Sequence, residues 1–147
     1  MSFLVRPARR DDRAQWDPLW QGYLTFYRTS LPAEITDRTW ARFFDSYEPV
    51  HALVAEEGGG LIGLVQYIYH RNTRMIGPVC YLQDLFTAEP ARGRGIGRAL
   101  IEAVYAAARA AGSPRVYWQT HETNATAQRL YDTLATKSGF IVYRKDI

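Results

Sequence analysis

The chain has 147 residues, of which 47% are hydrophobic and 22% charged, and its formal net charge is +3. This composition is typical of a globular protein and excludes a disordered chain, and the length fits one domain over residues 1–147. No apolar run approaches the roughly 20 residues that cross a membrane, so we expect no membrane contact. The N-terminal stretch lacks the apolar core of a signal peptide, and the single cysteine, Cys80, permits no internal disulfide. These features predict a cytoplasmic protein.

The excess of positive charge is too small to indicate a nucleic-acid-binding protein, which usually concentrates its basic residues along one stripe. The densest basic cluster, Arg92, Arg94 and Arg98, lies inside a glycine-rich segment. A small polyanion is a simpler partner for such a cluster than a nucleic acid. The three histidines are scattered and have no metal-ligand spacing with Cys80, so we predict no metal.

Hydrophobic periodicity predicts alternating strands and helices with no repeat and no linker. The clearest helix follows Gly95, because Ile96, Leu100 and Val104 recur on one face, and Gly112 stops it. A strand–helix–strand unit around this helix implies a parallel pair at the centre of a mixed sheet, which is an α/β fold. In chain order, we predict a strand at 3–6, a helix through 16–27, a helix at 37–46, a hairpin of strands at 51–56 and 61–69, a strand at 79–87, a helix at 95–111, a strand at 116–120, a helix at 124–134 and a strand at 140–145.

The segment Arg92-Gly93-Arg94-Gly95-Ile96-Gly97 joins the predicted strand at 79–87 to the clearest helix. Backbone N–H groups at a helix N-terminus, together with the helix dipole, attract phosphate oxygens. Glycines let the backbone approach the anion closely, and arginines add positive charge. The segment is therefore a candidate phosphate-binding loop.

On this loop alone, three alternatives compete. A Rossmann dinucleotide fingerprint requires a third glycine where this chain has Arg98 or Leu100, and an acidic residue about 20 positions on, where it has Arg115 and Val116. A P-loop requires a Gly-Lys-Ser/Thr sequence, which is missing. A glycine-rich helix start without any ligand stays open at this point.

The wider context resembles the GNAT superfamily of acetyl-CoA-dependent N-acetyltransferases. Their signature, Q/R-x-x-G-x-G/A after the fourth strand, is matched by Arg92-x-x-Gly95-x-Gly97. The segments 81–87 and 116–120, and the sequence Asn124-x-x-Ala127-x-x-Leu130-Tyr131, follow in family order and spacing. The resemblance covers about 81–143, and the N-terminal half more loosely. It implies a GNAT fold, in which helices flank a central mixed sheet that is splayed between strands four and five. Residues 117–131 also look like a narrower subgroup whose members acetylate histones, polyamines or D-amino acids.

The resemblance implies acetyl-CoA as cosubstrate and a primary amine as acceptor, such as a small amine, an amino acid or a lysine side chain. The pantetheine arm of acetyl-CoA is expected to pair with the backbone of the fourth strand, and Asn124 is expected to bond the same arm. By resemblance, the cofactor-binding residues are Leu85, Phe86, Thr87, Arg92, Gly93, Arg94, Gly95, Ile96, Gly97, Arg98, Asn124 and Tyr131.

Tyr131 occupies the family position of the general acid, which protonates the departing thiolate. An alkylamine with a pKa of about 10.4 also needs a base at neutral pH. Similar polyamine acetyltransferases carry Glu-Asp on strand four, whereas this chain has Gln83 followed by Asp84. Asp84 is therefore the candidate base or amine anchor, although strand alternation turns it away from Gln83 unless a bulge re-aims it. His121 and Glu122 are further candidates.

A catalytically silent acetyl-CoA sensor is the alternative function, and the retained Tyr131 argues against it.

The connection 132–139 before the last predicted strand is longer than in the family. This insertion leads us to expect that the last strand pairs with a second subunit, which makes a homodimer a hypothesis.

Overall fold

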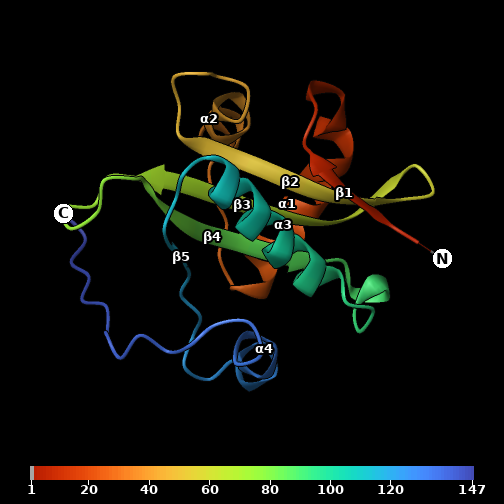
Figure 1. The fold of residues 1–147 in the computed structure, drawn as a ribbon. Coiled ribbons are helices and arrows are strands. Elements are labelled where there is room, and N and C mark those ends of the chain that lie inside the picture. The colour runs from red at the N-terminus through yellow and green to blue at the C-terminus, as the bar shows by residue number, and fades with distance from the viewer. Residues whose placement is uncertain (1) are drawn as a thin grey trace.

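A computed structural model of the protein describes residues 2–147, and it contains one five-stranded sheet with helices on both faces (Figure 1). The strand order is β1-β2-β3-β4-β5, and every neighbouring pair is antiparallel except the parallel pair β4–β5. The mixed sheet, the hairpin and the parallel pair are therefore confirmed. The parallel pair lies at one edge of the sheet and not at its centre, because β5 is the last strand in the order. The elements are β1 (Leu4–Pro7), α1 (Arg13–Phe26), α2 (Ala33–Arg42), β2 (Val50–Glu57), β3 (Gly60–His70), β4 (Val79–Thr87), α3 (Ile96–Ala110), β5 (Val116–Tyr117) and α4 (Ala125–Tyr131), with short 3-10 turns at Arg10–Asp12 and Glu89–Ala91.

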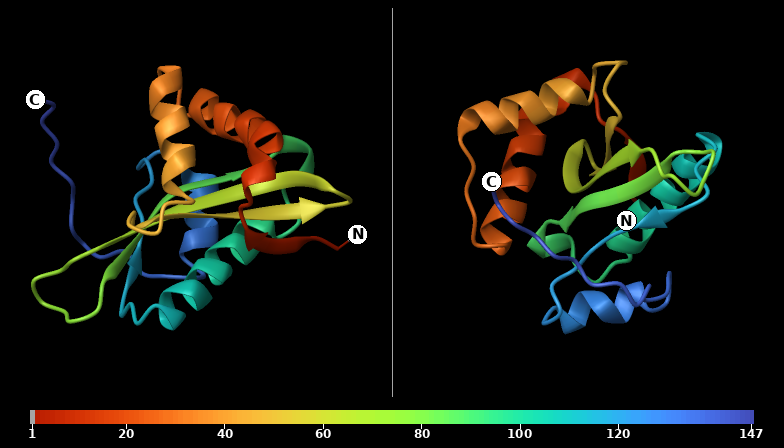
Figure 2. Two further views of the ribbon diagram at one scale, coloured as in Figure 1. Left: turned by 90° about the horizontal axis from the view of Figure 1, so that it is seen from above. Right: turned by 90° about the vertical axis from the view of Figure 1, so that its left-hand side faces the viewer.

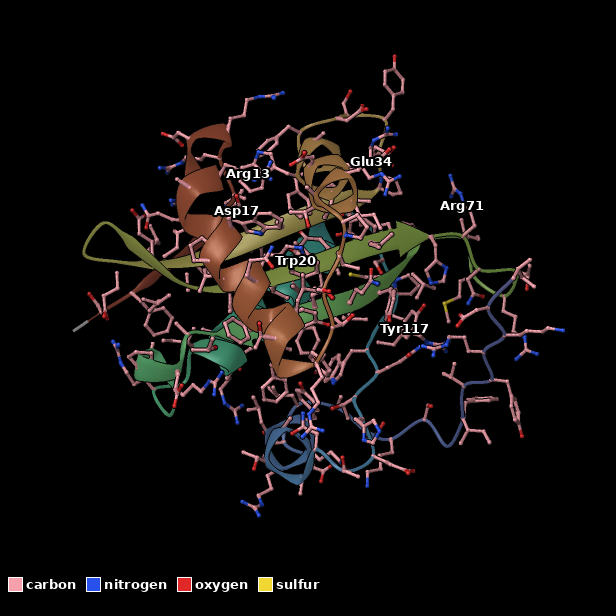
Figure 3. All side chains as sticks on the ribbon, turned by 180° about the vertical axis from the view of Figure 1, so that it is seen from behind. Arg13, Asp17, Trp20, Glu34, Arg71 and Tyr117 are labelled. Carbon is pink, nitrogen blue, oxygen red and sulfur yellow. The ribbon has the colours of Figure 1, made fainter. Side chains whose placement is uncertain are left out.

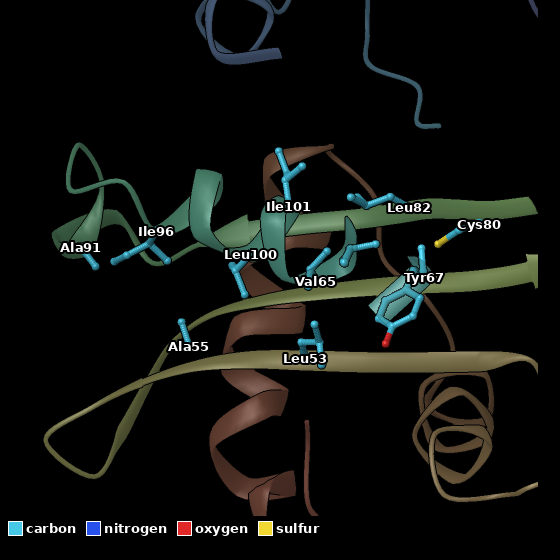
Figure 4. Close-up of a cluster of buried hydrophobic side chains, with 12 residues drawn as sticks. Leu53, Ala55, Val65, Tyr67, Cys80, Leu82, Ala91, Ile96, Leu100 and Ile101 are labelled. Atoms are coloured by element: carbon cyan, nitrogen blue, oxygen red, sulfur yellow. The ribbon is translucent and has the colours of Figure 1, made fainter. Parts of the chain in front are cut away.

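Two apolar cores lie on opposite faces of the sheet. Helices α1 and α2 cover one face and α3 covers the other, as the view from above shows (Figure 2). On the α3 side, Ile96 and Leu100 point from the helix onto the strands (Figure 4), and Val104, on the same stripe, is buried in the same cluster. On the other side, Trp16 and Trp40 bring α1 and α2 together over the sheet. No helix within residues 2–147 has the length and apolar character needed to cross a membrane.

Helix α2 begins and ends earlier than the aromatic residues at 40–44 led us to predict. It spans Ala33–Arg42, directly after Pro32, whose fixed φ suits a helix start. Phe43 and Phe44 follow in turns and still pack on the Trp16 core. The predicted end of this helix was wrong, because the aromatic rings can be buried without a helical backbone at their residues.

The predicted strand at 140–145 is wrong. No residue after Tyr131 belongs to a helix or strand, and the segment 138–147 extends away from the body (Figure 2). Its apolar side chains are open to solvent, with Phe140 87% and Tyr143 89% exposed. A strand needs a partner for its backbone groups, and within residues 2–147 this segment has none.

Candidate functional site

Strands β4 and β5 run together for only two residue pairs. Cys80 pairs with Val116 and Tyr81 pairs with Tyr117, and the predicted strand at 116–120 ends there. Beyond Tyr81, β4 still pairs with β3 on one side, but its edge toward β5 has no strand partner within residues 2–147. The backbone of Leu85 to Thr87 therefore borders an opening in the sheet.

The glycine-rich loop lies where β4 leads into α3. Gly93 and Gly95 have positive φ angles of 78° and 83°, and no heavy atom lies within 4 Å of the position that a Cβ would occupy at either residue. Gly95 caps α3, so the amides of Ile96, Gly97 and Arg98 form the unpaired first turn of the helix. The Ile96 side chain is buried in the α3 core, so only its backbone faces the loop.

The three arginines of the loop are held by contacts within the fold. Arg92 donates from Nε to the carbonyl of Thr87 at 3.0 Å, and its guanidinium lies 5.5 Å from the ring centre of Phe86. Arg94 forms an ion pair with Glu57 in the β2–β3 hairpin. Arg98 donates to Thr133 Oγ1 at 2.8 Å. The positive charge is thus gathered around the helix start.

A β-bulge at Gln83 decides which way Asp84 points. Gln66 of β3 pairs with Asp84, whereas the next residue, Tyr67, pairs with Leu82, so Gln83 is the extra residue. As a result, Leu82 packs in the α3 core, while Asp84, two positions later, faces α1. The bulge considered from the sequence is confirmed.

Asp84 is held in a buried hydrogen-bond chain. Gln66 donates from Nε2 to Asp84 Oδ2 at 2.8 Å and accepts at Oε1 from the Trp16 indole N–H at 2.9 Å. The carboxyl is 9% exposed, and burial raises its pKa, while hydrogen bonds from Tyr23 and Gln66 partly oppose the rise. A carboxyl with a raised pKa is a better proton acceptor than an ordinary one.

Tyr131 is the last residue of α4 and packs against Trp118, which directly follows β5. Its ring lies edge-on to Trp118, with 5.4 Å between ring centres, and it packs against the α3 core. Burial, with a smaller contribution from Tyr27, raises the pKa of Tyr131 to about 12. The phenol therefore stays protonated at neutral pH, as a proton donor must.

Asn124 caps α4, because its Oδ1 accepts from the backbone N–H of Ala127 at 3.4 Å. The side-chain nitrogen Nδ2 of Asn124 donates to Thr120 Oγ1 at 3.5 Å. His121 and Glu122 lie in the exposed turn before the helix, away from the buried Asp84.

A hollow of about 270 Å³ opens on the α1–α2 face of the sheet, beside the bulge. It lies in the region where Trp20 reaches from α1 toward α2 (Figure 3). Both polar and apolar side chains line it. The lining residues are Trp20, Leu31, Ile35, Thr39, Arg42, Phe43, Val50, Gln66, Ile68, Gln83 and Asp84.

A second, more open hollow of about 500 Å³ lies between α1 and the Phe86 end of the sheet. Its lining is mostly apolar, and Glu89 is its one ionisable residue. It contains neither of the catalytic candidates, Asp84 and Tyr131. The smaller hollow is therefore the better candidate for an acceptor site.

Sequence reasoning missed Gln66 and Arg42. Gln66 was detectable, since it is one polar residue within an otherwise apolar predicted strand. Arg42 gave no such signal, because an arginine near a helix end is ordinary. Two acidic residues of α2 lie outside this hollow: Asp37 pairs with Arg13, and Glu34 is exposed. Within residues 2–147, no group of three side chains is placed to hold a metal ion.

Comparison with known proteins places the chain in context. The model of the Acetyltransferase (GNAT) family matches residues 16–135. The D-amino-acid N-acetyltransferase HPA3 of Saccharomyces cerevisiae is 36% identical over 145 residues, which cover 97% of this chain and 90% of that protein.

Solved structures have the same fold at lower sequence identity. AAC(6')-Iy in complex with a CoA-containing bisubstrate analogue superposes with a TM-score of 0.86 at 16% identity, covering 100% of this chain and 99% of that one. A ribosomal-protein-alanine N-acetyltransferase from Brucella melitensis gives a TM-score of 0.83 at 18% identity, covering 99% and 100%.

Replacing Asp84 with Asn tests the burial of this carboxyl. Because the pKa of Asp84 is raised in the folded state, the folded protein retains the proton after the unfolded chain has lost it, above a pH of about 4. The free energy of unfolding therefore falls as the pH rises toward the pKa of the folded state. We expect a smaller fall between pH 4 and 7 in Asp84→Asn than in the wild type, measured by urea unfolding. Asp132→Asn, at an exposed residue, is the control, and parallel curves for Asp84→Asn and wild type would show that the carboxyl is not desolvated.

Proposed function

Because the chain belongs to the GNAT family of acetyltransferases, we propose that its acetyl-CoA lies on the loop at 92–97 and along the open edge of β4. The protein is an N-acetyltransferase, which transfers the acetyl group from acetyl-CoA to an amine. The observation that carries the proposed site is the opening between β4 and β5, where β4 bears Asp84 and leads into the phosphate loop. We propose that Tyr131, which packs on Trp118 just beyond β5, reaches the same opening.

The loop supports the binding of a pyrophosphate. The first turn of α3 has unpaired backbone N–H groups at the N-terminus of a helix of 15 residues. The helix dipole favours an anion at this end. Open space over Gly93 and Gly95 lets phosphate oxygens approach the backbone. Arg92, Arg94 and Arg98 supply a positive field, and Ile96 and Gly97 contribute through their backbone.

The remaining cofactor contacts follow the strand. Toward β5, the stretch from Leu85 to Thr87 has no strand partner within residues 2–147, and apart from the Thr87 carbonyl, which accepts from Arg92, this open edge suits an extended chain with amide groups such as pantetheine. An N–H in this stretch is our candidate donor to the thioester carbonyl. Asn124 caps α4 beyond the end of β5, and we propose it as a further contact to the arm.

The chemistry needs two proton routes. We assign Asp84 as the base that removes a proton from the ammonium group of the acceptor. The free amine attacks the thioester carbon, the C–S bond breaks, and Tyr131 donates a proton to the leaving thiolate. The second proton of the nitrogen leaves to solvent, and a proton from solvent restores Tyr131. Burial makes Asp84 a stronger proton acceptor, and Tyr131 is protonated at neutral pH, so the first can accept a proton and the second has one to donate.

Amino acids are the acceptor class that we favour, because the similar yeast protein acts on D-amino acids. The hollow beside Asp84 is small, which suits an acceptor of that size.

Nothing in the site favours a silent acetyl-CoA sensor, since the acid and the loop are both retained. Release of coenzyme A thiol from acetyl-CoA in the presence of amino acids, polyamines, aminosugars or basic peptides tests turnover, and no release with any class would contradict the enzyme.

A homodimer also remains our proposal. Among residues 2–147, the apolar segment 140–143 has no strand partner, and β5 is an edge strand with one side free. Exposed apolar residues next to an unpaired edge favour pairing between chains. A cytoplasmic enzyme without nucleic-acid or membrane partners remains a prediction from the composition.

Replacing Tyr131 with Phe is expected to lower kcat by about 100-fold, because general acid catalysis contributes 10²- to 10⁴-fold. The affinity for coenzyme A, measured by calorimetry, stays within about twofold because the ring is kept. With a pKa of about 12, Tyr131 causes no loss of wild-type activity by ionisation below a pH of about 11. The control is Tyr105→Phe, whose hydroxyl only bonds the carbonyl of Leu134. An unchanged rate in Tyr131→Phe at every pH would refute the assignment.

Replacing Gly95 with Ala is expected to weaken acetyl-CoA binding at least tenfold, because its φ of 83° strains an L-residue and a methyl group would occupy the space over the loop. Gly112→Ala is a matched control, since Gly112 has a φ of 76° at the opposite end of α3. Both changes should lower stability to a similar extent, but only the first should reduce affinity in a calorimetric titration. Equal losses of affinity would mean that strain, not the loop, is responsible.

The dimer is tested by changing both Phe140 and Val142 to Ser. Sedimentation of the wild type at about 20 μM should give the mass of two chains, and the double variant should give the mass of one, because the two side chains share one face of an extended segment. Lys145→Ser serves as the control and should sediment as the wild type does. A wild type with the mass of one chain would rule out the proposal.

A further inference from the structure

The hollow beside the bulge has two ionisable residues of opposite sign in its lining. Asp84 comes from β4 on the sheet, and Arg42 comes from the C-terminal end of α2. They are the only ionisable groups in that lining. The hollow is therefore charged at two places and has no net charge, which suits a ligand that carries one positive and one negative group.

Asp84 retains capacity for a ligand. Gln66 donates to Oδ2, and the nearby Tyr23 hydroxyl also stabilises the charged carboxyl. A carboxylate has about four acceptor sites, so acceptor capacity remains beside the contact with Gln66. Gln66 also fixes the carboxyl in place, which favours binding of an ammonium group at a defined position.

Arg42 has few competing contacts. Its nearest acidic partner is Glu48, with 3.8 Å between Nε and Oε1, which is longer than a hydrogen bond. Within residues 2–147, its guanidinium donates no hydrogen bond, and the side chain is 44% exposed. The forked guanidinium is thus available to bind a carboxylate with two parallel hydrogen bonds.

The other residues of the lining are mostly apolar, and together with the volume of the hollow they limit the polarity and size of the ligand. Leu31 comes from the α1–α2 connection, Ile35 comes from α2, Phe43 directly follows α2, and Ile68 comes from β3. The volume of about 270 Å³ lies just below the roughly 300–1,000 Å³ of sites for drug-sized ligands. A small molecule with an apolar side chain matches this lining.

We propose that Arg42 binds the carboxylate of an amino-acid acceptor whose ammonium group lies on Asp84, so that the enzyme selects zwitterionic amino acids with apolar side chains. This inference rests on the proposed function and adds the residue that recognises the carboxylate. A polyamine lacks the group that Arg42 binds and brings a second positive charge toward it. An amine of the same shape that lacks a carboxylate offers Arg42 no group to bind.

The test compares leucine with isoamylamine, the amine that remains when leucine loses its carboxylate. In wild-type enzyme, thiol release from acetyl-CoA should give a lower KM for leucine, with the D- and L-forms measured separately. Arg42→Gln should raise the KM for leucine by roughly 10- to 100-fold, the range expected for losing a charged hydrogen-bonded pair, and leave kcat within about twofold. Its KM for isoamylamine should stay unchanged.

Two further variants complete the experiment. Arg38→Gln, on the same helix one turn earlier and outside the lining, should behave as the wild type does. Arg42→Lys should recover part of the affinity for leucine, because it keeps the charge but not the fork. Equal changes for leucine and isoamylamine in Arg42→Gln, or no change for either, would overturn the inference while leaving the acetyltransferase intact. No thiol release by wild-type enzyme with any amine would instead contradict the proposed function, and the inference with it.

Discussion

The extra residue at Gln83 in β4 is the constraint on which the candidate site depends. Without it, Leu82 and Asp84 would face the same side, and a carboxyl would be buried in the apolar core under α3, at a cost of several kcal/mol. With it, Asp84 faces α1, where Gln66 and Tyr23 satisfy it. The bulge also follows closely on the two residue pairs that join β4 to β5. One irregularity therefore lies where the buried carboxyl and the opening in the sheet meet.

Polar groups on the α1 side hold this arrangement in an apolar layer. Trp16 is fully buried, and its indole N–H bonds Gln66, which in turn bonds Asp84. These two hydrogen bonds link α1, β3 and β4, so three elements together set the position of the Asp84 carboxyl. Within residues 2–147, no buried side-chain nitrogen or oxygen lacks a hydrogen-bond partner. A fully satisfied network of this kind is rigid, which favours a site with fixed geometry.

The two ends of the site bind by different physics. At the start of α3, backbone amides and arginines make a broad positive field that suits phosphates of many shapes. In the hollow, Asp84 and Arg42 are two separate points of opposite charge in a small apolar space, which suits few ligands. Donor binding thus relies on a feature shared by many helices, whereas acceptor choice depends on the residues that α2 and the bulge bring together.

The sequence by itself determined the α/β class, the hairpin, the parallel pair and the loop before α3, because these depend on local periodicity and on glycine and arginine at fixed spacing. Tertiary structure decided the rest. The direction of Asp84 depends on a register shift against β3, and the role of Arg42 depends on where α2 packs, so neither has a local signal. The segment 140–145 has the composition of a strand but forms none, because strand structure requires a partner edge, and its own chain offers none over residues 2–147.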